Sequence, residues 1–158
     1  MIKSTDSSSP NATELEDLKI LFNKGKTSLV AFPADKTVTN YSIPEGVTSI
    51  GYSAFDSCEN LRIITIPDSV KRIGQGAFWT CKGLENINIP EGVTSIESST
   101  FAECEALTSI TIPDSVSRIG NEAFQDCSKL TSIIFLGNAP TLGSAVFNRV
   151  AANAIVNH

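Results

Sequence analysis

Residues 43–134 read IPEGVTSIGYSAFDSCENLRIIT (43–65), IPDSVKRIGQGAFWTCKGLENIN (66–88), IPEGVTSIESSTFAECEALTSIT (89–111) and IPDSVSRIGNEAFQDCSKLTSII (112–134). The same unit of 23 residues therefore occurs four times in succession. Self-similarity with a period of this size is typical of a solenoid, in which one supersecondary unit stacks on copies of itself. The repeat predicts a stacked architecture that presents a regular surface.

Apolar residues recur at seven positions of the unit, and each position forms a column along the stack. One coil of this length cannot bury such a set alone, so stacking at the strand spacing of about 4.8 Å must bury each column in one continuous core. The columns are Val47, Val70, Val93, Val116 and Ala139; Ile50, Ile73, Ile96, Ile119 and Leu142; Phe55, Phe78, Phe101, Phe124 and Phe147; Cys58, Cys81, Cys104 and Cys127; Leu61, Leu84, Leu107 and Leu130; Ile64, Ile87, Ile110 and Ile133; and Ile43, Ile66, Ile89, Ile112 and Phe135.

The spacing of apolar residues within one coil predicts its conformation. Within residues 61–66 the last two inward residues, Ile64 and Ile66, alternate with Thr65, which is strand periodicity. Pro67 cannot donate to a strand ladder and ends the strand. Residues 70–73 predict a second, short extended piece. Residues 74–81 carry apolar residues at i, i+1 and i+4, which favours a short helical or 3₁₀ turn.

The pattern L-x-x-I-x-I-P-x-x-V-x-x-I-G-x-x-A-F-x-x-C resembles the BspA-like leucine-rich repeat over about residues 43–147. The departures fall in the third copy, where Glu97 replaces the glycine and Thr100 replaces the alanine. The resemblance implies an α/β class: a curved, right-handed solenoid with a parallel sheet on its concave side. It also implies a cell-surface or secreted protein, since members of the family are typically surface adhesins of host-associated bacteria and mucosal protozoa.

Residues 1–37 are expected to form a polar lead-in followed by a β-hairpin at about 18–32. Two apolar runs flank the glycine-bearing tetrad NKGK (23–26), a pattern typical of a hairpin. Thr13 and Glu16 favour the alternative of a short helix that begins with a capping box. The resemblance supports the hairpin, because such hairpins recur within arrays of this family.

The solenoid is expected to occupy residues 38–158, with four full repeats at 43–134 and a degenerate C-terminal coil. Val38 and Tyr41 fall on the strand columns when these are shifted back by one repeat, so they predict the first strand of the stack. The sequences at both ends resemble parts of further repeats. We therefore expect that a longer array continues beyond them.

Composition and charge exclude several functional classes. The net charge is −5 and the sequence has no basic patch that could neutralise phosphates, so nucleic acid is not an expected partner. The longest apolar run is only a few residues, which excludes a membrane-spanning helix and membrane insertion. The N-terminal segment MIKSTDSSSP lacks the apolar stretch of a signal peptide.

The sequence offers little for catalysis, and we expect neither enzymatic activity nor a cofactor. The only histidine is His158, the last residue, so no triad can be assembled around it. The four cysteines share one column and are expected to be buried, reduced core residues. A zinc ion needs ligands that converge on one point, which a linear column does not provide, so no metal is expected.

The candidate binding residues are the outward positions of the repeated strand, expected on the concave face. Framework positions are nearly uniform between copies while these positions differ, which is how a repeat scaffold diversifies a binding face. Trp79 is a further candidate anchor, since its column otherwise holds Asp56, Ala102 and Gln125. The concave-face candidates are Arg62, Ile63, Thr65, Glu85, Asn86, Asn88, Thr108, Ser109, Thr111, Thr131, Ser132 and Ile134.

These observations favour a non-enzymatic module for protein–protein interaction or adhesion. The expected partner is a protein, such as a host or matrix protein, with an extended glycan as a second kind of ligand. The face is too flat to engulf a small molecule. The alternative is a structural spacer that holds another domain of the parent protein away from a surface.

Overall fold

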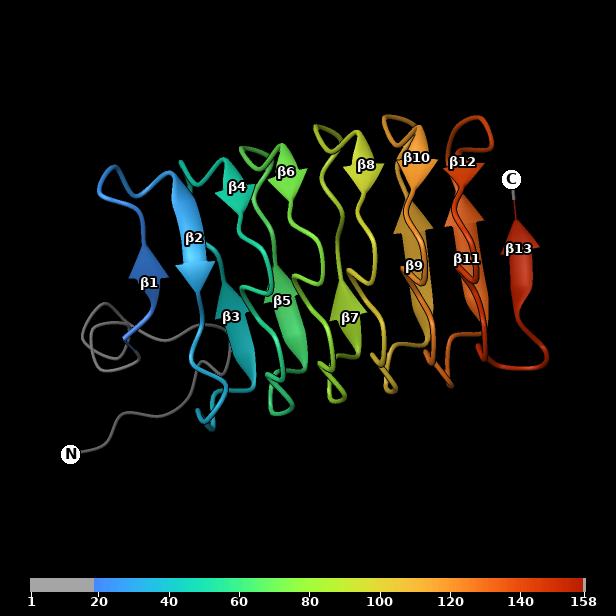
Figure 1. Ribbon diagram of the computed structural model, residues 1–158, viewed down its shortest axis with the longest axis horizontal. Helices are drawn as coiled ribbons and strands as arrows, with labels where there is room; N and C mark the ends of the chain where they lie inside the picture. Colours follow the sequence, from blue (N-terminus) through green and yellow to red (C-terminus); the bar gives the residue numbers. More distant parts are fainter. Residues whose placement is uncertain (1–18, 158) are drawn as a thin grey trace.

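The computed structural model describes residues 19–157 as a β-solenoid built from short strands β1 to β13 and the turns between them (Figure 1). The described residues contain no helix. The expected α/β class, with 3₁₀ or helical turns, is therefore corrected to an all-β solenoid. The lead-in before residue 19, the alternative capping box at Thr13 and Glu16, and His158 all lie outside the described residues.

The repeated strand forms the first strand column, in which each strand lies parallel to its counterpart in the next copy. Pairing keeps the repeat register, with Tyr41 opposite Ile64 and Ile64 opposite Ile87. These central residues point into the core, while their neighbours along the strand are exposed. The members are β3 (Asn40–Ser42), β5 (Ile63–Thr65), β7 (Asn86–Ile87), β9 (Ser109–Ile112), β11 (Ser132–Phe135) and β13 (Ile155–Asn157).

The V-x-x-I segment of each copy forms the second strand column, which Figure 1 shows as the upper row of arrows. Its strands are again parallel between copies, with Ile50 opposite Ile73 and Ile96 opposite Ile119. The members are β2 (Ser28–Ala31), β4 (Ser49–Ile50), β6 (Arg72–Ile73), β8 (Ser95–Ile96), β10 (Arg118–Ile119) and β12 (Thr141–Leu142).

The predicted hairpin is present and also adds a coil to the stack. β1 (Leu21–Phe22) pairs antiparallel with β2, and β2 pairs in parallel with β4. Leu29 and Phe32 are buried and take the places of the second-column isoleucine and the phenylalanine. This coil was missed in the sequence because Phe32 follows Leu29 by only three positions, whereas Phe55 follows Ile50 by five. The division of the chain at residue 37 stays a prediction.

The segment expected to be a 3₁₀ turn, residues 74–81 and their equivalents such as 51–58, forms turns that stack along the solenoid. We call this stack the turn column. Its backbone amides alternate between two kinds of hydrogen-bond partner. The amide of Asp56 donates within its own coil to the Ser53 carbonyl (3.1 Å). The amides of Phe55 and Ser57 donate to the next copy, to the carbonyls of Ala77 (2.7 Å) and Trp79 (2.9 Å). A 3₁₀ helix needs every amide to bond three residues back. Half of these amides donate instead to carbonyls of the next copy. The left-handed φ of Ser53 and Ser57 (48° and 58°) directs their amides toward that copy.

The core is a set of ladders that run the length of the stack. Phe78, Phe101 and Phe124 are fully buried, and their rings stack with centroids 5.4 and 5.3 Å apart. The four cysteines are buried as free thiols, and each donates to a phenylalanine carbonyl of the preceding coil, for example Cys81 Sγ to Phe55 O at 3.0 Å. Cysteine therefore fills space and also satisfies a carbonyl inside the core.

The columns weaken in the last described coil. Ala139 and Leu142 were expected to extend the valine and isoleucine columns, but both are exposed, Leu142 by 50%. Phe147 does continue the phenylalanine ladder, with its ring 5.6 Å from that of Phe124. No described coil covers the outer side of Ala139 and Leu142, so their columns end at the surface.

Both strand columns are interrupted between the second and third copies. β6 is not paired with β8, and β7 is not paired with β9, although every other neighbouring pair is hydrogen-bonded. The turn column is continuous across this junction, where Phe78 N donates to Thr100 O at 2.9 Å. The junction is therefore held by the turn column and the core rather than by the strands.

Glu97 accounts for the interruption between β6 and β8 in the second strand column. At this position the second copy has Gly74 and the fourth has Gly120, and a Cβ there would lie 2.7 Å and 2.5 Å from backbone atoms of the preceding coil. Real Cβ atoms do not approach backbone so closely, so only glycine permits the regular spacing. We attribute the lost strand pairing to the Cβ of Glu97, which holds the third copy away from the second on this side.

Candidate functional site

The candidate residues in the middle of the first strand column line one shallow groove. The groove has a volume of about 320 Å³ and lies over β7 and β9, at the interruption between these strands. Its walls combine polar side chains with one exposed leucine, Leu136, which is 59% exposed. The lining residues that were predicted from the sequence are Asn86, Asn88, Ser109 and Thr111.

Asn88 also has a structural role in this groove. Its Oδ1 accepts from the Ile66 amide (3.0 Å) and its Nδ2 donates to the Ile66 carbonyl (2.8 Å). The side-chain amide therefore replaces the backbone pairing that a longer β7 would make, and it faces the preceding copy. Because this side chain points back toward β5, it leaves the junction with β9 unbridged and the groove open.

The other predicted residues extend the same face on both sides of the groove. Arg62 and Glu85 form an exposed salt bridge (3.1 Å) between neighbouring copies. Ile63 is 44% exposed, an apolar side chain on a polar face. Thr65 and Thr108 are exposed, while Thr131, Ser132 and Ile134 are half-buried. The assignment of this face as concave stays a prediction.

Trp79 lies apart from this face, in the turn column. Its indole Nε1 donates to Glu103 Oε1 at 3.3 Å, and its side chain is 44% exposed. The structure therefore does not bring Trp79 together with the predicted strand residues. Leu136 and Glu91, which the sequence reading missed, do line the groove. The sequence held a signal for Leu136, since the repeat has proline at this position in the other copies.

The four cysteine thiols are buried in the core. Burial raises the pKa of the Cys58 and Cys127 thiols to about 12, and that of Cys81 and Cys104 well above its ordinary value. A thiol held protonated in this way is a poor nucleophile. Residues 19–157 contain no group of histidine, cysteine or acidic residues arranged to hold a metal ion. The same residues form no helix that could cross a membrane.

The stacked parallel strands, the ladder core and the exposed strand face define a leucine-rich repeat protein. The particular kind follows from the family comparison, in which the BspA-type leucine-rich repeat region matches residues 27–153 with six copies. The chain belongs to this family. The first of the six copies begins at the coil that β2 opens, ahead of the four copies that are evident in the sequence.

Solved structures of similar proteins include surface proteins of bacteria. A leucine-rich cell surface protein of Faecalibacterium prausnitzii A2-165 is 38% identical, with a TM-score of 0.67 over 68% of this chain. The match covers only 28% of that protein's chain. A leucine-rich repeat protein from Bacteroides capillosus is 30% identical, with a TM-score of 0.60 over 74% of this chain and 91% of that one. The pneumococcal vaccine antigen PcpA shares the fold, at 24% identity and a TM-score of 0.76 over 88% of this chain and 35% of that one. Among curated proteins no match is found.

Proposed function

We propose that the chain is a non-enzymatic protein-binding module of a cell-surface or secreted protein, and that it acts in adhesion. The similarity to a bacterial cell surface protein at 38% identity supports the location. The binding face is the exposed side of the first strand column. Its partner is a protein of the host or matrix, because a broad regular face suits a large partner.

The groove over β7 and β9 is the observation that carries this proposal. It joins hydrogen-bonding side chains, Asn86, Ser109 and Thr111, to the exposed apolar side chain of Leu136, and the exposed Ile63 lies outside the groove on the same face. Protein interfaces have the same composition, a small apolar centre inside a polar rim. A specific interface buries roughly 800 Å² on each partner. Adjacent coils of the first strand column place their exposed side chains next to one another, which forms a face broad enough for such an interface.

A matched pair of serine variants tests this face. Ser109 lies in the groove on β9, whereas Ser117 lies just before β10 in the second strand column, and both are exposed. Binding of the chain to a defined array of immobilised mucosal and extracellular-matrix proteins should be measured by interferometry. For each protein that binds, Ser109→Arg should weaken affinity at least about tenfold, because the longer side chain blocks the groove. Ser117→Arg should leave the affinity within about twofold.

Thermal unfolding of each variant supplies the control for folding, since exposed substitutions of this kind change stability by about 0.5 kcal/mol or less. Equal losses from both variants would remove the groove from the binding site. No loss from either variant, or no binding across the array, would contradict the module and favour a spacer.

A further inference from the structure

A second and larger groove runs over the exposed side of the second strand column. It has a volume of about 650 Å³ and spans four successive coils, from β2 to β8. The proposed protein-binding face does not include any of its residues. Its floor is formed by strand residues and by Gly51 and Gly74, where the backbone itself is accessible. Its polar lining includes Ser28, Ser49, Gln75, Thr94 and Ser95.

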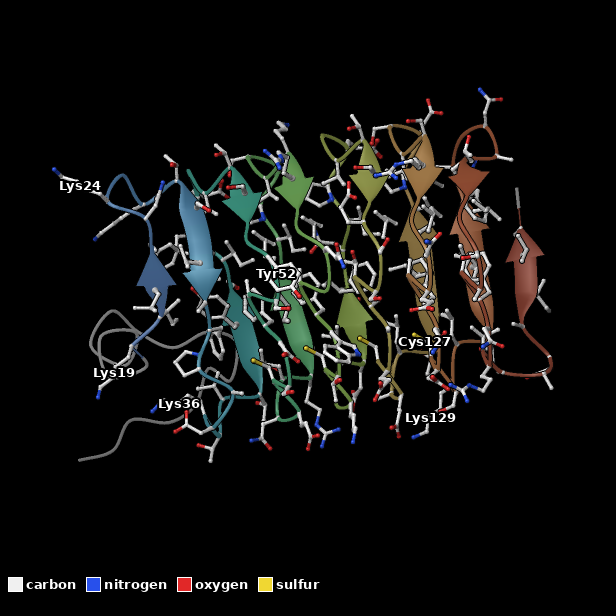
Figure 2. All side chains as sticks on the ribbon, in the orientation of Figure 1. Lys19, Lys24, Lys36, Tyr52, Cys127 and Lys129 are labelled. Carbon is white, nitrogen blue, oxygen red and sulfur yellow. The ribbon has the colours of Figure 1, made fainter. Side chains whose placement is uncertain are left out.

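Tyr52 stands at this groove with its side chain largely in solvent. Tyr52, which is labelled in Figure 2, is 72% exposed, and no other large apolar or aromatic side chain of the described residues is more exposed. The other copies have Gln75, Ser98 and Asn121 at this position. The ring serves no ladder of the core, so it offers a free aromatic surface beside hydroxyl and amide groups.

The charge at this groove is opposite to that of the chain. Lys71 and Arg72 line it, and Glu97 is the only acidic residue among the described residues that line it. The Glu97 carboxylate is already occupied, since Oε1 accepts from Ser95 Oγ (2.7 Å) and Oε2 pairs with Arg118 Nη2 (2.9 Å). Among the described residues Arg72 forms no salt bridge, and its side chain is exposed. A cationic groove with a free guanidinium therefore lies on a chain whose net charge is −5.

These features together select a ligand class. A guanidinium binds a carboxylate through two parallel hydrogen bonds. An exposed aromatic ring packs against the C–H face of a sugar, while serine, threonine and glutamine side chains exchange hydrogen bonds with its hydroxyls. A peptide would pair its backbone with a free strand edge, yet β4 is paired on both sides. The edge of β6 that faces β8 is unpaired, but the turn column joins the two coils at this junction, where Gly76 N donates to Ser98 O (3.0 Å) and Phe78 N to Thr100 O (2.9 Å).

We propose that the groove over β4, β6 and β8 binds a glycan that bears a carboxylate, such as a uronic or sialic acid. The Arg72 guanidinium holds the carboxylate, and the Tyr52 ring packs against a sugar ring. Gln75 and Thr94 bind sugar hydroxyls. This inference does not depend on the proposed protein-binding face, which lies on the other strand column.

The test is a titration of the folded chain with trigalacturonate and with 3′-sialyllactose at low salt, followed by amide NMR shifts. Binding should be saturable and should shift the amides of Tyr52, Arg72 and Gln75. Arg72→Gln should weaken binding at least about tenfold, and Tyr52→Ala about fivefold or more. The control is Lys129→Gln, which removes an exposed cation well away from Tyr52 in Figure 2 and should leave the affinity unchanged.

Neutral sugars and an acidic peptide test whether the groove recognises the carboxylate and the sugar together. The methyl ester of trigalacturonate and plain lactose should bind more than about tenfold more weakly, because the carboxylate is gone. Equal binding of these neutral probes would overturn the proposal. So would equal binding of hexaglutamate at the same amides, since the groove would then recognise acidic peptide. Failure of both acidic sugars to bind would also overturn it.

Discussion

Gly120→Ala tests directly whether glycine sets the spacing between neighbouring coils. Gly120 is buried, and a Cβ added to it would lie 2.5 Å from Ser98 N and 2.8 Å from Glu97 C. Both contacts are with backbone, which cannot rotate out of the way. The third and fourth copies must therefore separate on this side, which strains the Gly120 N to Ile96 O hydrogen bond (2.7 Å) and the pairing of β8 with β10.

The expected cost follows from three contributions. Overpacking costs about 1–3 kcal/mol. Loss of one or two backbone hydrogen bonds adds about 0.5–1.5 kcal/mol each. The lower entropy of the unfolded alanine chain offsets about 0.4–1 kcal/mol. The free energy of unfolding should therefore fall by about 2–4 kcal/mol.

Urea unfolding measures this change, and Gly25→Ala is the matched control. A Cβ at Gly25 would lie 3.8 Å from its nearest neighbour, Thr27 Oγ1, so we expect a change of about 0.5 kcal/mol or less. The converse variant, Glu97→Gly, should allow β6 to pair with β8 and slow hydrogen exchange at both strands. A cost below about 0.5 kcal/mol for Gly120→Ala would refute the close-packing argument and the explanation of the interruption.

Three further predictions concern the core. Phe101→Ala should lower the unfolding free energy by about 3–5 kcal/mol, because Phe101 is fully buried between two stacked rings; a cost below about 1 kcal/mol would show that the ladder does not stabilise the fold. Tyr41→Phe should be neutral or stabilise by up to about 1 kcal/mol, because the buried Tyr41 hydroxyl has no hydrogen-bond partner among residues 19–157; a clear loss would mean that the hydroxyl has one. Burial raises the pKa of Cys58 and Cys127 to about 12, so the unfolded chain loses thiol protons first, and stability to urea should fall as pH rises above about 8.5. Replacing Cys127 by alanine should reduce that dependence, and an unchanged dependence would contradict its thiol origin.

The architecture was predictable because it depends on a pattern that occurs four times. Each apolar column of the four copies is buried in the structure, and the register between copies follows from the repeat length itself. The turn column was not predictable from one coil. Its apolar spacing, with Ala77, Phe78 and Cys81, satisfies a helical turn equally well. Only the neighbouring coils, which accept half of its hydrogen bonds, decide against the helix.

The candidate site was predictable in part. Alternation along the strand correctly identified Asn86, Ser109 and Thr111 as outward residues. Alternation could not show that Asn88 binds the backbone of the preceding copy, because that contact depends on where β7 ends. Tyr52 was overlooked for a related reason. It follows the strand on the turn side, where the repeat pattern leaves the side-chain direction open.

The interrupted junction also divides the molecule mechanically. In a linear array each coil is stabilised by its immediate neighbours alone, so cooperative units end where a contact between neighbours is weakest. The coils before residue 88 and those after residue 89 are joined without strand pairing. We expect them to behave as two units that can open separately. Under a pulling force along the stack, the molecule should yield first at this junction, and each half should keep its fold while the tether between them lengthens.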